Sequence, residues 1–321
     1  MKVLVTGGAG YVGSTLVPLL LDAGHEVTVL DALLFGGTPL LGAWAHPRFR
    51  LLAGDIRDGA TVDAAVTGMD AVVHLAAIVG DPACARDPDL ARQTNLEASL
   101  GLIAAAEQAG VRRFVFASTC SNYGRMADPS SLVDEDSPLA PVSLYAETKV
   151  AVEQALLGRR RHQMVVTPLR FATVFGVSPR MRFDLTVNEF TLALLRDRHL
   201  VVFGEQFWRP YVHVRDVARA ILLVLAASPD KVDGEVYNVG ATSQNFQKLQ
   251  LVELVQPYAP DAIVEYVSRK EDPRDYRVSF TKIATRLGFE ITIPVADGVA
   301  EVARLVEAGI VPGAVIGAAV P

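Results

Sequence analysis

A tyrosine and a lysine stand four positions apart, at Tyr145 and Lys149, in the run Tyr-Ala-Glu-Thr-Lys. Side chains with this spacing share one face of a helix. A free phenol ionises near pH ~10, so it needs neighbouring positive charge to act as a base at neutral pH. Because the Lys149 ammonium favours the phenolate, the pair predicts abstraction of a hydroxyl proton by Tyr145. A surface tyrosine beside a solvated lysine is the alternative.

A glycine-rich turn near the N-terminus indicates the cofactor that such a base would serve. The run Thr-Gly-Gly-Ala-Gly-Tyr-Val-Gly at residues 6–13 follows an apolar run and precedes a helix-like run at 14–23. In a strand–turn–helix unit, these glycines permit the turn, admit a pyrophosphate to the backbone and let helix and strand pack closely. The pyrophosphate lies at the positive end of the helix dipole. The turn predicts cofactor contacts at Gly7, Gly10, Tyr11, Val12 and Gly13.

The ends of the following strand-like runs supply the rest of a nucleotide site. Asp31 ends the run 26–31 and suits the ribose hydroxyls, whereas its charge repels a 2′-phosphate. The predicted cofactor is therefore NAD rather than NADP. An acidic turn at Asp55 and Ile56 is expected to hold the adenine. A buried strand is expected at 71–77, and the small residues that follow it leave room for a flat cofactor. At the end of this strand, Leu75, Ala76 and Ala77 are expected to contact the cofactor.

An oxidised nicotinamide completes the chemistry of the tyrosine and lysine pair. Its positive ring favours the Tyr145 phenolate, and its carbon accepts the hydride that leaves as the hydroxyl loses its proton. Lys149 is also expected to hold the nicotinamide ribose. The sequence thus predicts an enzyme that oxidises a carbinol.

Composition excludes several other classes of protein. Half of the 321 residues are apolar and the formal net charge is −6, so no basic face for nucleic acid or an anionic membrane is expected. The two cysteines, Cys84 and Cys120, form no metal or disulfide pattern, which fits a reducing, cytoplasmic setting. No signal peptide or membrane-spanning run is apparent.

Strand-like and helix-like runs alternate through the first half of the chain. This spacing is typical of a parallel, doubly wound sheet. We expect an α/β protein with a Rossmann-type NAD-binding domain at 1–176 and a smaller, mixed α/β substrate lobe at 177–321. Segments near 212–242 are expected to return to the first domain. Two long helices are predicted at 89–109 and 144–157.

Taken together, these motifs resemble those of the extended short-chain dehydrogenase/reductase family. The residues that carry the likeness are the glycine turn, Asp31, Gly54-Asp55-Ile56, His74-Leu75-Ala76-Ala77, Asn95, Ser118-Thr119 and the Tyr145/Lys149 pair. Within this family the chain resembles the nucleotide-sugar epimerases and dehydratases, from Lys2 to about Val306. The resemblance implies that Asn95 and Ser118 contribute to the cofactor site.

The same resemblance assigns the substrate side. Thr119 matches the residue that shares the substrate hydroxyl with Tyr145. Two arginines match those that grip the nucleotide diphosphate, for which charge-assisted, bidentate bonds are suited. Two further positions match those that hold the diphosphate and the base, with ordinary core or surface roles as the alternative. These four residues are Arg209, Arg269 (in Arg269-x-x-Asp272), Asn188 and Phe203.

The chain departs from its family after Thr119. Dehydratases of this family carry Asp-Glu there and decarboxylases carry a Glu, but this chain has Cys120 and Ser121, so no acid remains to expel water from C6 of a sugar. Ala172 replaces the Asn of many 4-epimerases, and Pro210 replaces Asp or Thr, so the standard substrate UDP-galactose is not implied.

Cys120 leaves two readings open. Similar enzymes that epimerise C3 or C5 of a 4-keto sugar place a cysteine here, whose thiolate removes a proton beside the ketone. That chemistry needs an acid on the opposite ring face, and Arg180 and Arg182 are poor proton donors. A thiol that lines the pocket is the alternative, and Cys84 is expected to be structural.

We expect an NAD-dependent epimerase that inverts C4 of a nucleoside-diphosphate sugar through a transient 4-keto sugar. The alternatives are a 4-keto-sugar reductase, a C3/C5 epimerase that uses Cys120, and a non-catalytic NAD-binding regulator. The last does not need Thr119, Tyr145 and Lys149 together. A homodimer paired through the helices at 89–109 and 144–157 is expected, with no metal, nucleic acid or membrane partner.

Overall fold

A seven-stranded parallel sheet carries the candidate site. The computed structural model describes residues 1–125, 131–158, 164–268 and 274–310. The strand order is β10-β6-β5-β4-β1-β2-β3, and every neighbouring pair is parallel. The strands are β1 (Lys2–Thr6), β2 (Glu26–Asp31), β3 (Phe49–Ala53), β4 (Ala71–His74), β5 (Arg113–Thr119), β6 (Val165–Phe171) and β10 (Tyr237–Val239). The carboxyl ends of all seven strands therefore meet at one edge.

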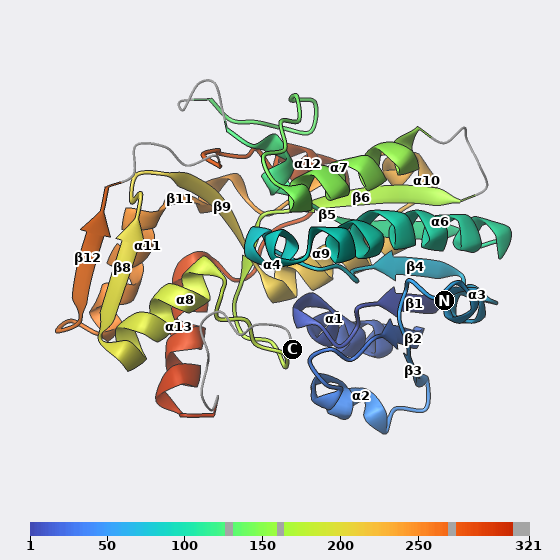
Figure 1. Ribbon diagram of the computed structural model, residues 1–321, viewed down its shortest axis with the longest axis horizontal. Helices are drawn as coiled ribbons and strands as arrows, with labels where there is room; N and C mark the ends of the chain where they lie inside the picture. The colour runs from blue at the N-terminus through green and yellow to red at the C-terminus, as the bar shows by residue number, and fades with distance from the viewer. Residues whose placement is uncertain (126–130, 159–163, 269–273, 311–321) are drawn as a thin grey trace.

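Helices cover both faces of this sheet, so its strands are apolar on both sides (Figure 1). Val3 and Val5 pack in one core with helices α1 (Tyr11–Asp22) and α9 (Val214–Ala226). Leu4, which points the opposite way, packs in a second core. The helices of that second core are α3 (Gly59–Val66), α6 (Ala98–Gln108) and α7 (Leu144–Leu157).

Short helical segments connect these elements. They are η1 (Thr38–Leu40), α2 (Leu41–Trp44), α4 (Asp81–Arg86), α5 (Pro88–Arg92), the π-helical turn η2 (Gln93–Glu97), η3 (Cys120–Tyr123) and α10 (Pro229–Val232). The helix expected at 89–109 is thus α5, η2 and α6 in succession, interrupted by a π-helical turn. The helix expected at 144–157 has these bounds in the structure.

The second lobe lies beside the sheet, with β8, β12 and α11 at the left of Figure 1. Its two small sheets are β11-β9-β7 and β12-β8, and a separate core joins them to its helices. The elements are β7 (Thr173–Phe175), α8 (Thr186–Leu192), the π-helical turn η4 (Ala193–Asp197), β8 (His199–Phe203), β9 (Trp208–His213), η5 (Thr242–Gln244), β11 (Asn245–Gln247), α11 (Lys248–Val255), η6 (Gln256–Tyr258), β12 (Ile263–Val267) and α13 (Val295–Glu307). Helix α12 (Thr281–Leu287) instead contacts β10 and packs in the main core.

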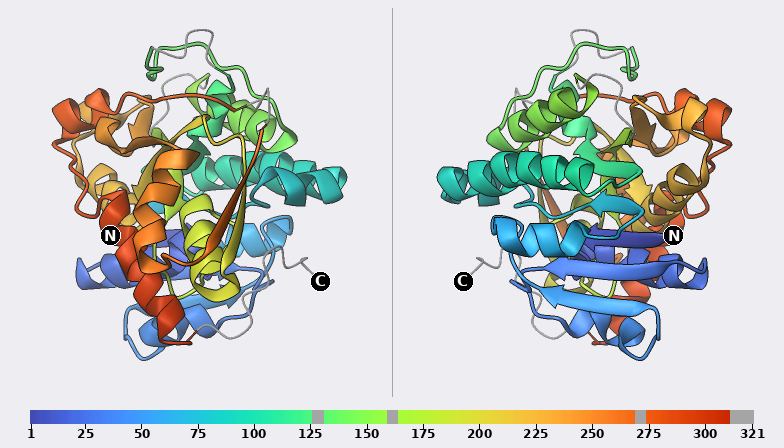
Figure 2. Two further views of the ribbon diagram at one scale, coloured as in Figure 1. Left: turned by 90° about the vertical axis from the view of Figure 1, so that its left-hand side faces the viewer. Right: turned by 90° about the vertical axis from the view of Figure 1, so that its right-hand side faces the viewer.

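The two parts are interleaved in sequence. After β9 the chain forms α9 and then β10, which pairs with β6 at the edge of the large sheet. The turned views of Figure 2 show the blue strands β1–β3 side by side and the red helix α13 on another side of the molecule. Within the range 212–242, helix α9 and strand β10 therefore pack with the large sheet.

Candidate active site

The glycine turn lies closer to the segment after β4 and to the first turn of α1 than a Cβ atom would allow. Gly7 has φ +73°, and a Cβ there would lie 2.7 Å from the backbone N of Ala76. A Cβ on Gly13 would lie 2.4 Å from the carbonyl oxygen of Gly7. Gly10 is the N-cap of α1 and supplies no side-chain cap, which leaves the N–H groups of Tyr11 and its neighbours to an anion.

Asp31 faces this turn from the end of β2. Its Oδ2 accepts the backbone N–H of Ala9 at 2.8 Å, and its Oδ1 accepts that of Leu33 at 2.8 Å. Each carboxylate oxygen has a second lone pair, so the pair of ribose hydroxyls can still be bound. A glycine cradle at a helix N-terminus with a fixed carboxylate beside it fits a dinucleotide such as NAD.

The segment after β4 is positioned by Asn95. This side chain is 1 % exposed, accepts the backbone N–H of Ile78 at 2.8 Å and donates to the carbonyl oxygen of Ile78 at 2.9 Å. The half-buried Leu75, Ala76 and Ala77 lie just before Ile78. Asn95, which the π-helical turn carries, therefore acts on the loop and does not itself face a ligand.

At the adenine end, the expected residues have internal partners. The Asp55 carboxylate accepts hydrogen bonds from the Arg57 guanidinium, and these bonds hold the pKa of Asp55 below its usual range. Ile56 is buried in the core under α3. Contacts from this turn to an adenine remain a prediction.

Lys149 is fixed between α7 and the end of β5. Its side chain is 3 % exposed, and Nζ donates to the carbonyl oxygen of Ala117 at 2.9 Å. Nζ also lies 4.8 Å from the ring centroid of Phe116 and 5.9 Å from that of Tyr145. Burial lowers the pKa of Lys149 to about 8, against a smaller opposing effect of Cys84.

Burial also governs Tyr145, which is half-buried at the start of α7. Burial raises the pKa of this phenol, the Arg182 guanidinium opposes the rise, and Cys84, Asp81 and Tyr276 add to it. Without cofactor, Tyr145 is therefore a neutral phenol. The positive charge that opposes the rise is thus that of Arg182, on the substrate-lobe loop.

Thr119 ends β5, and a buried ion pair fixes the residue before it. The Thr119 side-chain oxygen accepts the backbone N–H of Ser121 at 3.1 Å. Ser118 is 2 % exposed and donates to Glu153 at 2.8 Å, so its hydroxyl is engaged inside the protein rather than by a cofactor. Glu153 in turn forms a buried salt bridge with Arg170 of β6. Glu153 and Arg170 thus tie α7 to the strands beside it.

The Cys120 thiol points into the protein. It is 1 % exposed, donates to the carbonyl oxygen of Arg170 at 3.3 Å and belongs to the main core. Burial raises the pKa of this thiol, and the nearby Arg170 charge offsets only part of the rise. A thiolate is the nucleophilic or basic form of cysteine, so this environment opposes the catalytic reading. Cys84 is likewise buried, with its thiol on the carbonyl oxygen of Ile78 at 3.4 Å.

Asn188 holds a loop instead of facing a ligand. Its side chain is fully buried; Oδ1 accepts the backbone N–H of Gly176 at 2.9 Å, and Nδ2 donates to the carbonyl oxygen of Arg182 at 2.9 Å. Nδ2 also lies 3.2 Å from the hydroxyl of Tyr11, which donates to the carbonyl oxygen of Gly176 at 2.6 Å. A diphosphate contact would compete with these bonds, which favour a positioning role for Asn188, and its expected substrate contact stays a prediction.

The remaining substrate residues lie in the second lobe. Arg209 of β9 is 7 % exposed, donates to the carbonyl oxygen of Trp208 at 2.7 Å and has its guanidinium carbon 5.4 Å from the ring centroid of Tyr276. Phe203, at the end of β8, is 43 % exposed and suits stacking on a base. Arg269 lies outside the described residues.

Sequence reasoning did not assign Arg182, Tyr276 or the Glu153–Arg170 pair to the site. The charge of Arg182, in the other lobe, lowers the pKa of Tyr145 against the effect of burial, and Arg182 is itself paired with Asp184 at 2.6 Å. Tyr276 is 2 % exposed, with its hydroxyl 3.5 Å from the Ser121 hydroxyl. The spacing of Tyr145, Lys149 and Glu153 on one helix face is the only local signal that pointed to any of them.

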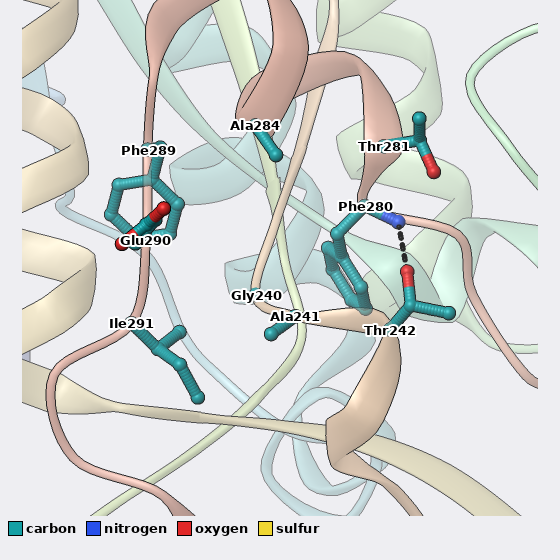
Figure 3. A pocket seen from close by; sticks show the side chains of 9 residues that line it. All are labelled: Gly240, Ala241, Thr242, Phe280, Thr281, Ala284, Phe289, Glu290 and Ile291. Carbon is teal, nitrogen blue, oxygen red and sulfur yellow. Dashed lines mark hydrogen bonds between the residues drawn. The ribbon is translucent and has the colours of Figure 1, made fainter.

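A separate cavity of about 340 Å³ lies beyond β10 and contains none of the site residues. Figure 3 shows its lining, with Phe280 next to Gly240 and Thr242, and with Phe289, Glu290 and Ile291 on the other side. Within the described residues, no group of His, Cys, Asp or Glu has the arrangement of a metal site. No helix in the same residues is long and apolar enough to cross a membrane.

Fold and site together define a dinucleotide-dependent protein of the extended short-chain dehydrogenase/reductase type. The family described as "NAD dependent epimerase/dehydratase family" matches residues 3–240. The chain belongs to this family, and NAD is its cofactor.

Its relatives include both dehydratases and epimerases. A dTDP-glucose 4,6-dehydratase from Streptomyces niveus is 34 % identical over 94 % of this chain and 91 % of that protein. The structure of DesIV, a dTDP-glucose 4,6-dehydratase from Streptomyces venezuelae with NAD and TYD bound, is 31 % identical, with TM-score 0.84 over 96 % and 97 % of the two chains. That of a Thermotoga maritima UDP-glucose 4-epimerase with UDP-glucose is 28 % identical, with TM-score 0.85 over 97 % and 100 %.

Proposed function

We propose that the protein epimerises a nucleoside-diphosphate sugar at C4 through a transient 4-keto sugar. The observation that carries this proposal is the combination of Thr119, Tyr145 and Lys149 with Cys120 and Ser121 at the positions next to the threonine. The first three residues suit oxidation and reduction of a carbinol. The last two offer no acid for elimination.

Each residue has a defined part in this reaction. Thr119 and Tyr145 bind the C4 hydroxyl, and Tyr145 takes its proton as the C4 hydrogen leaves with its electron pair. Bound NAD supplies the hydride acceptor and returns the hydride to C4. Turning of the keto sugar presents its other face, after which Tyr145 gives the proton back to the oxygen. Lys149 stabilises the tyrosinate, and the cycle is redox-neutral.

Dehydration is the strongest competitor, because relatives at 34–36 % identity are dTDP-glucose 4,6-dehydratases. Dehydratases of this family place two acids directly after the threonine, and a thiol that is 1 % exposed does not replace them. The same burial disfavours epimerisation at C3 or C5, which requires the Cys120 thiolate.

The substrate side suits a nucleoside diphosphate. We infer that Arg209, and Arg269 by its motif, bind the diphosphate and that Phe203 stacks on the base. Exposed apolar residues on α6 and α7, Leu100 at 37 % and Leu157 at 38 %, support the pairing of two copies through these helices. We also propose a cytoplasmic protein, in which both cysteines stay reduced.

The test is incubation of the NAD-loaded protein with UDP-, GDP-, CDP-, ADP- and dTDP-sugars in D2O, with products followed by NMR. A C4 epimer without deuterium uptake supports the proposal. A 4-keto-6-deoxy sugar would make the protein a dehydratase, and deuterium at C3 or C5 would make it a C3/C5 epimerase. Light scattering of the eluted protein checks the dimer.

A further inference from the structure

Two loops from distant parts of the chain meet at a single aromatic contact. One loop follows Asp31 and carries Phe35, which is 52 % exposed. The other follows β7 and carries Arg180, whose guanidinium carbon lies 3.9 Å from the Phe35 ring centroid. A guanidinium at this distance over an aromatic ring makes a cation–π contact.

The second loop is fastened to the first turn of α1. The Ser178 hydroxyl donates to the carbonyl oxygen of Tyr11 at 2.7 Å and lies 3.0 Å from the hydroxyl of Ser14. The Thr15 hydroxyl donates to Ser178 at 3.2 Å. Ser178 and Tyr11 are both buried, so this attachment is shielded from water.

The first loop is fastened to the glycine turn from the other end. Asp31 joins Ala9 to Leu33 through its two carboxylate oxygens. Leu33 has φ +54°, a conformation that costs a branched side chain free energy and persists only where neighbouring contacts enforce it. Such strain is typical of ligand clamps.

These contacts form a closed ring. It runs from Ala9 through Asp31 to the Phe35 loop, across to Arg180, and back through Ser178 to Tyr11, next to the glycine turn. One side of the ring is therefore the backbone where a dinucleotide pyrophosphate binds. The side across from it is the contact between Phe35 and Arg180.

The charge of the second loop suits the same ligand. Arg180 and Arg182 bring two guanidiniums near α1, and Asp184 pairs with Arg182. Burial and, less strongly, the Arg182 charge lower the pKa of Arg180, and the Asp184 charge opposes this change. Two arginines against one aspartate leave the loop positive, which favours a doubly charged pyrophosphate.

We propose that Phe35 and Arg180 form a clasp over bound NAD, so that the cofactor leaves only when this contact opens. The other links are hydrogen bonds between a side chain and the backbone, all of them buried or partly buried, whereas the Phe35–Arg180 contact joins two side chains near solvent and opens first. The proposal rests on NAD as cofactor and not on the reaction at C4. A clasp of this kind keeps NAD in place between turnovers.

The rate at which NAD dissociates from the protein tests the clasp directly. Protein loaded with NAD and freed of excess is mixed with ethanol and alcohol dehydrogenase, which reduces the released NAD to fluorescent NADH. We expect Phe35→Ala and Arg180→Gln each to speed release about two- to fivefold, the range for one exposed cation–π contact. The double variant should release NAD no faster than the faster single variant, because both changes remove one contact.

Matched controls separate the clasp from general loosening. Leu34→Ala removes a neighbouring side chain that is 60 % exposed, and Arg286→Gln removes an exposed arginine of α12; both should release NAD at the wild-type rate. Wild-type release in both single variants, at unchanged melting temperature, would overturn the proposal. So would additive effects in the double variant.

A cross-link provides the opposite test. In a Phe35→Cys, Arg180→Cys variant, a short bis-maleimide is added after NAD has bound. The joined protein should retain NAD when the unjoined variant releases it, and protein joined before NAD is added should fail to take it up. Equal release from joined and unjoined protein would contradict the clasp.

Discussion

The cofactor side and the substrate side of the site are built by different means. On the cofactor side, Gly7, Asp31 and Leu75 stand at or directly after the carboxyl ends of parallel strands, so the register of the sheet places them, as it places the catalytic Thr119. On the substrate side, placement depends on bonds between residues far apart in sequence, such as Tyr11 with Gly176. Strand ends thus fix the chemistry, and long-range contacts fix the loops that select and retain ligands.

Loss of the tyrosine hydroxyl, which α7 places beside the carboxyl end of β5, tests the chemistry of the site and has the largest expected effect. In Tyr145→Phe the proton acceptor is gone, and we expect kcat to fall by about 10³-fold, within the range for general acid–base groups. NAD content should stay unchanged because the phenol is not part of the glycine turn. The exposed Tyr266 of β12 is the control: Tyr266→Phe should retain full activity. A Tyr145→Phe enzyme with near-normal kcat would remove Tyr145 from the mechanism.

Arg209 tests the other side through binding. Replacing it with Gln removes a charge-assisted contact to the diphosphate, worth about 1.5–3 kcal/mol, so KM should rise about 10- to 100-fold with a smaller change in kcat. Arg198→Gln, which removes a half-exposed arginine of the same lobe, should leave KM unchanged. If kcat fell with KM constant, Arg209 would act on the reaction and not on binding.

The same division explains what the sequence allowed us to predict. The glycine turn, Asp31 and the strand before Ser118 are local patterns, in which the flanking strand and helix are part of the signal. The bounds of α7 also follow from local sequence. Fold class, cofactor and family could therefore be predicted from short stretches read one at a time.

The substrate side could not be predicted in this way. The hydrogen-bond partners of Asn188 are Tyr11, Gly176 and Arg182. The sequence around Asn188 does not indicate these partners. The π-helical turn around Asn95 interrupts a stretch that reads as one continuous helix. Burial of Cys120 depends on β6, about fifty residues away in sequence. Such contacts exist only once the chain has folded.

Asn188 can decide between a structural role and a ligand contact. We expect Asn188→Ala to lower the free energy of unfolding by about 1–3 kcal/mol, because it leaves buried polar groups without partners. The loop at 176–188 should loosen from α1, so NAD should also leave faster. Chemical denaturation and NAD release measure the two effects. A raised KM for the sugar nucleotide at unchanged stability would instead restore the diphosphate contact that the sequence suggested.

Burial of Lys149 lowers the free energy of unfolding by an amount that depends on pH. Its folded pKa of about 8 lies below the ordinary 10.5, so the folded protein resists protonation that the unfolded chain accepts. The loss in free energy of unfolding is fully present below pH ~8, where Lys149 is protonated in the folded protein too, and it disappears as pH rises toward ~10. In NAD-free protein at pH ~6, Lys149→Met should therefore gain about 1–3 kcal/mol of stability, and the gain should vanish at high pH. A gain that is independent of pH would point to packing instead.

Cys120 gives the smallest expected effect and the sharpest distinction. If the Cys120 thiol only fills the core and donates to the carbonyl oxygen of Arg170, Cys120→Ala should lower the free energy of unfolding by about 1 kcal/mol. The kcat of Cys120→Ala should stay near the wild-type value, with no deuterium in the product of either enzyme. If Cys120 were a catalytic base, the same variant would instead show a large loss of kcat with little change in stability. Thr119 ends β5 and is proposed to bind the substrate hydroxyl, whereas Cys120, the next residue, turns into the core. Two adjacent residues at one strand end thus have different roles, one in catalysis and one in packing.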